Sequence, residues 1–147
     1  MEYRTMTMDD YEQVYKLWVI CNNGINDKDD SYEGIEKYLK RNPGMSFVAT
    51  CDNTVVGVIL SGHDGRRGYI QHMSVSPDYR RHGIGRKLVD LALEALEAED
   101  IKKVALVAFS RNELGNAFWE AQGFTLRTDL NYRNKALVEL KKLNKGF

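Results

Sequence analysis

The sequence predicts a mixed α/β domain around a central sheet, and three observations indicate this. Apolar residues first recur at helical spacing, and from residue 46 they fall in runs rich in Val, Ile, Phe and Thr. Helical spacing then returns over residues 83–97, between two strand-like segments. The 147 residues contain no repeat, low-complexity tract or long linker. We therefore expect a single domain, residues 1–147, with one sizeable core.

The N-terminal part is expected to form one strand and two helices. Residues 2–6 fit a short opening strand. Thr7 is suited to cap a helix with an acidic first turn, whose apolar face continues to about residue 21. A polar, acidic loop follows over residues 22–30. The second helix begins after Ser31 and carries apolar side chains at Ile35, Tyr38 and Leu39.

The middle of the chain is expected to form three strands and a helix. Two apolar runs, Ser46–Cys51 and Thr54–Ser61, are separated by Asp52-Asn53, a pair that favours a tight hairpin. A polar loop over Gly62–Gly68 leads into a third strand, Gly68–Val75. The amphipathic helix over residues 83–97 follows.

The C-terminal part is expected to complete the sheet. Lys102–Ala108 fits a strand, and Asn112–Gln122 fits a short helix ended by Gly123. Phe124–Arg127 and Leu137–Leu140 are interpreted as the last two strands. The predicted order is therefore β-α-α-β-β-β-α-β-α-β-β.

Composition and charge exclude several classes of protein. Lysine and arginine number 21 and are balanced by 21 acidic residues, which argues against a broad nucleic-acid surface. No stretch has the length of a membrane span, and the N-terminus lacks the apolar region of a signal peptide. Cys21 and Cys51 show no metal-binding spacing, so no metal is expected. We expect a cytoplasmic protein that binds neither nucleic acid nor membrane.

The most informative motif is the run Val-Ser-Pro-Asp-Tyr-Arg-Arg-His-Gly-Ile-Gly-Arg-Lys, residues 75–87. It joins a predicted strand to a predicted helix. Glycines at a helix start let an anion approach the free backbone N–H groups, and the basic side chains add charge of the right sign. A dinucleotide fingerprint would need a third glycine where Leu88 stands, and a Walker loop would need Gly-Lys-Ser/Thr. The motif predicts a cradle for a diphosphate.

Two motifs carry a resemblance to a known family. The spacing Arg80-x-x-Gly83-x-Gly85 resembles the acyl-CoA pyrophosphate motif of the GNAT family of N-acetyltransferases. Residues 112–124 resemble the family's later segment, in which an asparagine precedes a short helix and a Gly-Phe strand start. The resemblance covers nearly the whole chain. Within the family, the chain is similar to small bacterial enzymes that acetylate the alanine of ribosomal proteins. It implies the acyl-CoA N-acyltransferase fold, a mixed, mostly antiparallel sheet with helices on both faces.

The resemblance also implies acetyl-CoA as co-substrate and a set of residues that hold it. The strand before the cradle is expected to splay from its neighbour at a bulge, so that Met73 and Val75 pair with the pantetheine arm. The loop amides would meet the pyrophosphate, with Arg80 holding the loop's shape. The implied cofactor-binding residues are Met73, Ser74, Val75, Arg80, Arg81, His82, Gly83, Ile84, Gly85, Arg86, Lys87, Asn112, Asn116 and Trp119.

Neither of the family's usual catalytic groups stands at its position. Trp119 occupies the place of the tyrosine acid, and Val107 that of the glutamate base. Tyr69 and Gln71 share one face of the predicted strand and are candidates to relay protons through water. In a regular strand His72 would point to the opposite face, which favours a structural role. Proximity of amine and thioester is a further source of rate.

We expect transfer of an acetyl group from acetyl-CoA to a primary amine by direct attack. The acceptor is a protein N-terminus or a small amine, which Asp27, Asp29 and Asp30 could attract. Tyr132, in a late loop, is a candidate to replace the missing tyrosine. The alternative is a regulatory module that binds acyl-CoA without turnover. The sequence leaves open whether the chain forms a homodimer.

Overall fold

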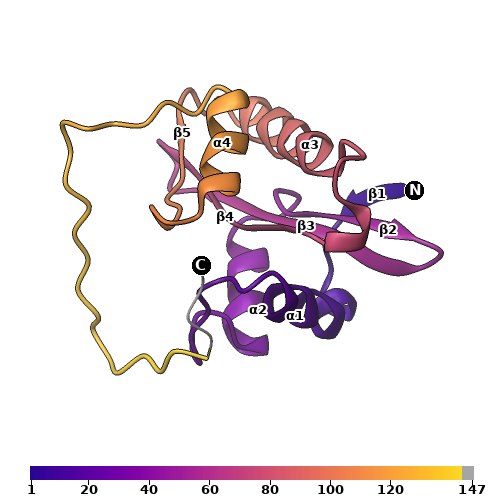
Figure 1. Cartoon of the computed structure of the whole chain (residues 1–147). Helices are drawn as coiled ribbons and strands as arrows, with labels where there is room; N and C mark the ends of the chain where they lie inside the picture. Colours follow the sequence, from indigo (N-terminus) through magenta and orange to yellow (C-terminus); the bar gives the residue numbers. More distant parts are fainter. Residues whose placement is uncertain (144–147) are drawn as a thin grey trace.

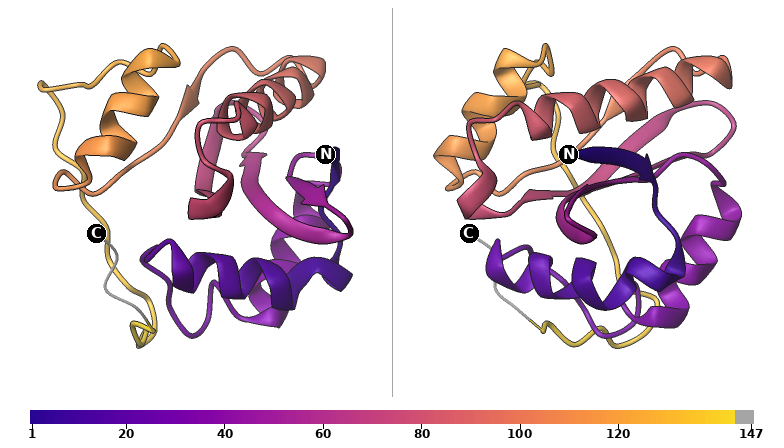
Figure 2. Two further views of the ribbon diagram at one scale, coloured as in Figure 1. Left: turned by 45° about the vertical axis from the view of Figure 1, so that its right-hand side comes forward. Right: turned by 90° about the vertical axis from the view of Figure 1, so that its right-hand side faces the viewer.

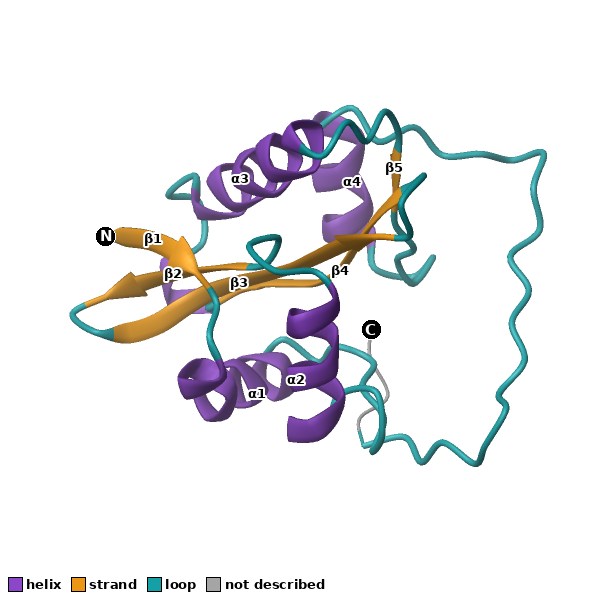
Figure 3. Cartoon of the chain, turned by 180° about the vertical axis from the view of Figure 1, so that it is seen from behind, coloured by secondary structure: helices purple, strands orange, loops and turns teal. Residues whose placement is uncertain are grey.

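The computed structural model describes residues 1–143 and shows one sheet between two pairs of helices (Figure 1). Helices α1 and α2 cover one face of the sheet, and α3 and α4 cover the other (Figure 3). The strands are β1 (Glu2–Thr5), β2 (Phe47–Cys51), β3 (Thr54–His63), β4 (Gly68–Val75) and β5 (Val104–Ala105). The helices are α1 (Tyr11–Ile20), α2 (Tyr32–Arg41), α3 (Ile84–Ala98) and α4 (Glu113–Ala121), with short 3-10 turns at Met8–Asp10 and Pro77–Tyr79.

The five strands lie in the order β1-β2-β3-β4-β5. Neighbours from β1 to β4 are antiparallel, and β5 alone runs parallel to β4. This confirms the predicted mixed, mostly antiparallel sheet. The β2–β3 hairpin turns at Asp52 and Asn53, whose φ angles of 49° and 65° are those of a tight hairpin turn. The turn pair was therefore interpreted correctly.

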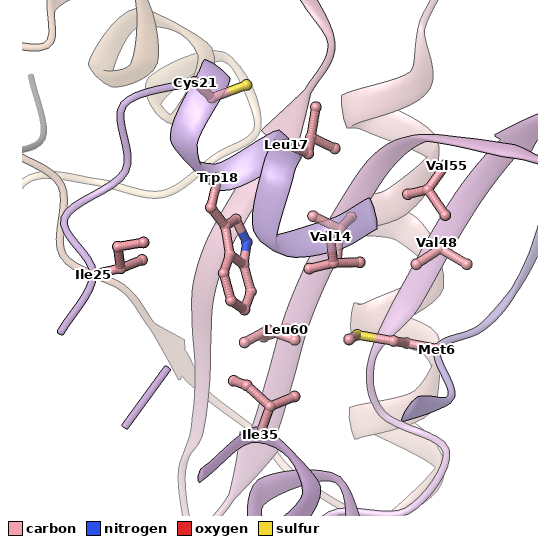
Figure 4. Close-up of a cluster of buried hydrophobic side chains, with 11 residues drawn as sticks. Met6, Val14, Leu17, Trp18, Cys21, Ile25, Ile35, Val48, Val55 and Leu60 are labelled. Atoms are coloured by element: carbon pink, nitrogen blue, oxygen red, sulfur yellow. The ribbon is translucent and has the colours of Figure 1, made fainter. Parts of the chain in front are cut away.

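Hydrophobic clusters form on both faces of the sheet. On one face, α1 packs Val14, Leu17 and Trp18 against β2 and β3, and Ile35 of α2 joins them (Figure 4). On the other face, α3 buries the side chains that were predicted for its apolar stripe, among them Ile84, Leu88 and Ala92. Each fully buried aliphatic side chain contributes roughly 1.5–3 kcal/mol. Both faces of the sheet are therefore covered, as in other α/β folds.

The prediction of two last strands was wrong. Residues 124–127 and 137–140 are irregular, and Leu126 and Leu137 are exposed over 74% and 92% of their surface. The predicted strand Lys102–Ala108 shrinks to the two residues of β5. Because so short a strand offers no long edge for pairing, the chain after α4 has no ladder to continue.

The segment after α4 instead crosses from one helical layer to the other (Figure 2). It returns to the loop before α2, where Asp27 N donates to Lys141 O at 2.9 Å and Leu143 N donates to Ile25 O at 2.9 Å. The end of the described chain is thereby tied to residues 25–27. Within residues 1–143, no helix is both long and apolar enough to cross a membrane.

Helix α2 starts close against the loop that precedes it. Ser31 caps it, since the Gly34 amide donates to the Ser31 hydroxyl at 3.0 Å. A Cβ at Gly34 would lie 2.3 Å from the Lys28 carbonyl oxygen and 2.5 Å from that of Asp29. Both contacts are with backbone, so relief requires the loop to move.

We expect Gly34→Ala to lower the free energy of unfolding by about 2 kcal/mol, although alanine is normally the better helix former. The reason is the collision with the loop backbone. Urea denaturation followed by circular dichroism measures the change. Lys37→Ala, at an exposed position of the same helix, is the control and should stay within about 0.5 kcal/mol of wild type. A Gly34→Ala protein as stable as wild type would contradict the close packing.

Candidate functional site

A cleft of about 1230 Å³ opens where β4 and β5 part. Only two residue pairs join these strands, Gly68 with Val104 and Tyr69 with Ala105. Beyond them, residues 70–75 of β4 line one wall and residues 106–109 line the other. Helix α4, the loop before α3 and residues 21–24 close the remaining sides. The expected splay of the strand before the cradle is thus present.

A bulge interrupts β4 inside the cleft. Leu60 pairs with Gln71 and Val58 pairs with Ser74, so one residue of β3 faces two residues of β4, His72 and Met73. His72 adopts a φ of 46°, which few residues other than glycine adopt. The alternation of side chains therefore breaks at this point, and His72, like Tyr69 and Gln71, lines the cleft.

The cradle has the free donors that an anion requires. Within the described chain, none of the main-chain N–H groups of residues 81–86 donates a backbone hydrogen bond. Gly83 begins α3 with a φ of 76°, and a Cβ built on it would meet nothing within 4 Å. Gly85 has no such freedom, since its Cβ would lie 3.3 Å from the Phe118 ring. These two glycines thus keep the helix start open and allow α4 to approach.

Arg80 ties the cradle to the strand that precedes it. Its Nε donates to the Val75 carbonyl at 3.3 Å, and its Nη2 lies 3.8 Å from Cys21 Sγ. Burial raises the pKa of the Cys21 thiol, and the Arg80 charge opposes this in part. Arg80 thus links three walls of the cleft, as a residue that holds the loop's shape would.

Most of the predicted cofactor-binding residues lie together. The cleft is lined by Met73, Ser74, Val75, Arg80, Arg81, Gly83, Ile84, Gly85, Arg86, Asn112 and Trp119. Three others do not line it: His82 borders a separate hollow beside Tyr79, and Lys87 and Asn116 lie outside both.

Several of these side chains are also occupied structurally. The Ser74 hydroxyl donates to Asn23 Oδ1 at 2.8 Å, and this joins β4 to the loop after α1. Asn112 caps α4 by accepting from the Gly115 amide at 3.0 Å. Asn116 Nδ2 donates to the carbonyl oxygens of Phe109 and Asn112, at 2.9 and 2.8 Å. Their amide groups thus hold the wall of the cleft in place.

The two catalytic candidates, Tyr69 and Gln71, line the cleft, and so do Val107 and Trp119, which stand at the family's usual catalytic positions. Burial raises the pKa of Tyr69, and the nearby Tyr132 raises it further. Tyr69 therefore keeps its proton at neutral pH and can donate a hydrogen bond. Trp119 packs edge-on against Phe118 and Phe124, with ring centroids 5.0 and 5.2 Å apart. It forms an apolar wall.

Sequence reasoning missed one pair of residues at the cleft. His72 Nε2 lies 2.7 Å from Asp30 Oδ1. A regular strand would have turned this side chain away from Tyr69 and Gln71, and the family resemblance implied a bulge in this strand without placing it at His72. The aspartate belongs to the acidic loop that was noted, but pairing across 42 residues depends on tertiary structure. Only the structure brings the two together.

Comparisons with known proteins agree with this geometry. The model of a family described as "Acetyltransferase (GNAT) family" matches residues 11–124. An acetyltransferase of Sodalis glossinidius (strain morsitans) is 31% identical over 139 residues, covering 95% of this chain and 97% of its own length.

Solved structures share the fold. Ard1 from Thermoplasma volcanium superposes with a TM-score of 0.77 at 22% identity, covering 86% of this chain and 83% of its own. The PaiA N-acetyltransferase from Thermoplasma acidophilum, solved in complex with coenzyme A, gives a TM-score of 0.72 at 18% identity, covering 86% and 90%.

We expect Gly83→Glu to weaken acetyl-CoA binding about a hundredfold, because like charges about 4 Å apart repel by roughly 1–4 kcal/mol. The new carboxylate would stand beside the free amides, in the space that an anion needs. Isothermal titration calorimetry measures the affinity.

The matched control for this substitution is Gly65→Glu. Gly65 also has a positive φ, 91°, and open space around its Cβ, but it lies in a turn outside the cleft. Its variant carries the same backbone strain and charge and should bind acetyl-CoA normally. Equal affinities of the two variants would rule out a diphosphate cradle at residues 81–86.

Proposed function

Because the chain belongs to the acetyltransferase (GNAT) family, we propose that it moves the acetyl group of acetyl-CoA to a primary amine by direct attack. Membership of the family makes the chain an acetyl-CoA-dependent acetyltransferase. What we propose is that the acceptor is a primary amine and that it attacks the thioester directly. One observation carries it: the free edge of β4 and the free amides of the cradle line the same cleft. The same proposal treats residues 1–147 as one catalytic domain.

The cleft fits an elongated acyl thioester. At about 1230 Å³ it exceeds the usual range for small-molecule pockets, roughly 300–1,000 Å³. On the β5 side, Met73 and the Val75 N–H have no strand partner, so a pantetheine chain can bond there as an added strand, whereas the Val75 carbonyl already accepts from Arg80. The amides of residues 81–86, with Arg81 and Arg86, are placed to hold the diphosphate. Acetyl-CoA supplies the activated acetyl group, and the chain holds and orients it.

Direct attack is supported by the state of the two thiols. Cys21 lines the cleft, but burial raises the pKa of its thiol, so the reactive thiolate is disfavoured. Cys51 lies on β2, away from the cleft. Neither thiol is placed as a ready acyl carrier. A positioned amine gains rate from orientation alone.

The acceptor is a protein N-terminus or a small amine. Resemblance to acetyltransferases of ribosomal-protein alanine favours the former. The aspartates that could attract an amine are partly occupied: Asp27 accepts from the Lys141 amide, Asp29 accepts from Asn26, and Asp30 holds His72. Asn22, Asn23 and Gly24 also line the cleft, and they add neutral groups to it.

Tyr69 is the group best suited to assist the departing sulfur. Since burial and Tyr132 raise its pKa, it remains a hydroxyl that can donate, directly or through water. Gln71 cannot ionise, and its amide can only orient a water. Tyr132 lines the cleft from the late segment and can act beside Tyr69. Neither Tyr69 nor Gln71 is a base at neutral pH.

We expect saturable release of coenzyme A thiol that depends on an added amine, measured against a panel of N-terminal peptides, polyamines and amino acids. An acceptor in one class and not in the others would identify the substrate class. Tight binding of acetyl-CoA without turnover on the whole panel would contradict the proposal and favour an acyl-CoA-binding regulatory module.

We expect Tyr69→Phe to lower kcat about tenfold or more while the Kd for acetyl-CoA stays within about twofold, because only the donating hydroxyl is lost. Steady-state kinetics and calorimetry give the two values. Tyr32→Phe, which removes a hydroxyl from an exposed tyrosine outside the cleft, serves as the control. An unchanged kcat would exclude Tyr69 from proton transfer.

A further inference from the structure

A histidine–aspartate pair lies at the cleft and has no role in the steps described so far. His72 Nε2 and Asp30 Oδ1 are 2.7 Å apart, and only 17% and 6% of the two side chains are exposed. The second carboxylate oxygen, Oδ2, accepts from the Asn26 amide at 2.8 Å. A carboxylate is rarely buried this deeply without partners, and here both of its oxygens are engaged. The aspartate is therefore held firmly in one orientation.

The ring of His72 is fixed on its other sides as well. The Trp18 ring lies 5.0 Å away, centroid to centroid, at an angle of 55°. Trp18 is itself fully buried and points from α1 toward the sheet (Figure 4). The bulge in β4 sets the direction in which the histidine leaves the backbone. Three separate elements thus place one imidazole.

The pairing determines which nitrogen is available. A carboxylate only accepts, so Nε2 carries the hydrogen in the neutral ring and Nδ1 keeps a lone pair. In the part of the chain that the structure describes, Nδ1 has no hydrogen-bond partner and is not a fully buried atom. His72 lines the cleft together with Cys21, Asn23 and Tyr69. A residue that lines the cleft thus carries an unprotonated, unpaired ring nitrogen.

We propose that His72 is the general base that takes a proton from the acceptor amine, with Asp30 as its positioning residue. The inference rests on the proposed function. An amine that enters the cleft is charged at neutral pH and must lose a proton before it can attack. Imidazole is the side chain best suited to accept it near neutral pH. The base absent at Val107 is thereby supplied from the neighbouring strand.

The proton balance is complete without a further reactant. The ammonium gives one proton to Nδ1, and its nitrogen then forms a bond to the carbonyl carbon of the thioester. The carbon–sulfur bond breaks, and its electron pair goes to sulfur. The second proton of the nitrogen passes to that sulfur through Tyr69 or cleft water, which leaves an amide and a thiol. The imidazolium releases its proton to solvent.

The decisive variant is His72→Gly, because glycine accepts the positive φ of this position and removes the ring. We expect kcat/KM for the best amine to fall about a hundredfold, while the Kd for acetyl-CoA stays within about twofold. Added imidazole should restore turnover in proportion to its concentration. A purely structural histidine would give no such rescue, and a variant that keeps wild-type kcat/KM would overturn the proposal.

His63→Gly is the matched control. His63 also faces a carboxylate, with Nε2 3.5 Å from Glu99, and its side chain is 20% exposed. It lies at the end of β3, outside the cleft. This variant should keep the wild-type kcat/KM, and added imidazole should not change its turnover. If both variants lost activity equally, the loss would reflect folding and the proposal would fail.

A second readout needs no turnover. Long-range ¹H–¹⁵N spectra of the imidazole nitrogens should show wild-type His72 with its hydrogen on Nε2, and Asp30→Asn should lose this preference. A hydrogen on Nδ1 in the wild type would overturn the assigned base while leaving the proposed acetyl transfer untouched. Absence of turnover with every amine would instead contradict the proposed function, so the two failures are distinguishable.

Discussion

The site depends on the early end of the β4–β5 ladder. Two residue pairs hold the strands together, and the six following residues of β4 have an unpaired edge. Unpaired backbone groups are costly when they are buried, so a strand edge of this kind is kept where solvent or a ligand bonds it. The wall of residues 106–109 could not stand apart if β5 continued. The shortness of β5 is therefore a condition for the cleft.

The bulge in β4 adds a second constraint, at the same place. A non-glycine residue with positive φ costs about 1–2 kcal/mol, and such strain persists only where the surroundings impose it. His72 meets this condition, since Asp30 and Trp18 hold its ring while Ser74, two residues on, is bonded to Asn23. In the proposed function, the strand is a template for the thioester at one end, and at the bulge it positions the imidazole.

Much of the fold could be read from the sequence, because hydrophobic period, caps and turn pairs are local signals. The Asp52-Asn53 turn, the Ser31 cap and the apolar stripe of α3 are of this kind. The prediction of the last two strands was wrong because their pairing depends on the length of the β5 edge, which the local sequence does not reveal.

The candidate site divides in the same way. The cradle follows from two glycines and their neighbours, and it could be located from sequence alone. The His72–Asp30 pair could not, because period-two reasoning assumes a regular strand and the partner stands 42 residues away. Ser74 and Asn116 show the same limit: each was expected to meet a ligand, and each is bonded within the protein. Side-chain partners across elements are tertiary information.

In the proposed function, the cradle binds the diphosphate through main-chain N–H groups, which every residue except proline possesses. Arg81, His82 and Arg86 can be exchanged over generations without losing a single amide donor, whereas Gly83 and Gly85 are constrained by shape. The acceptor side, as proposed, relies on individual side chains such as His72 and Tyr69, and residues 25–27 are hydrogen-bonded to Lys141 and Leu143. Substitutions can therefore change which acceptor binds while the backbone groups that would hold the coenzyme stay the same. One fold can in this way serve different acceptors with a single coenzyme.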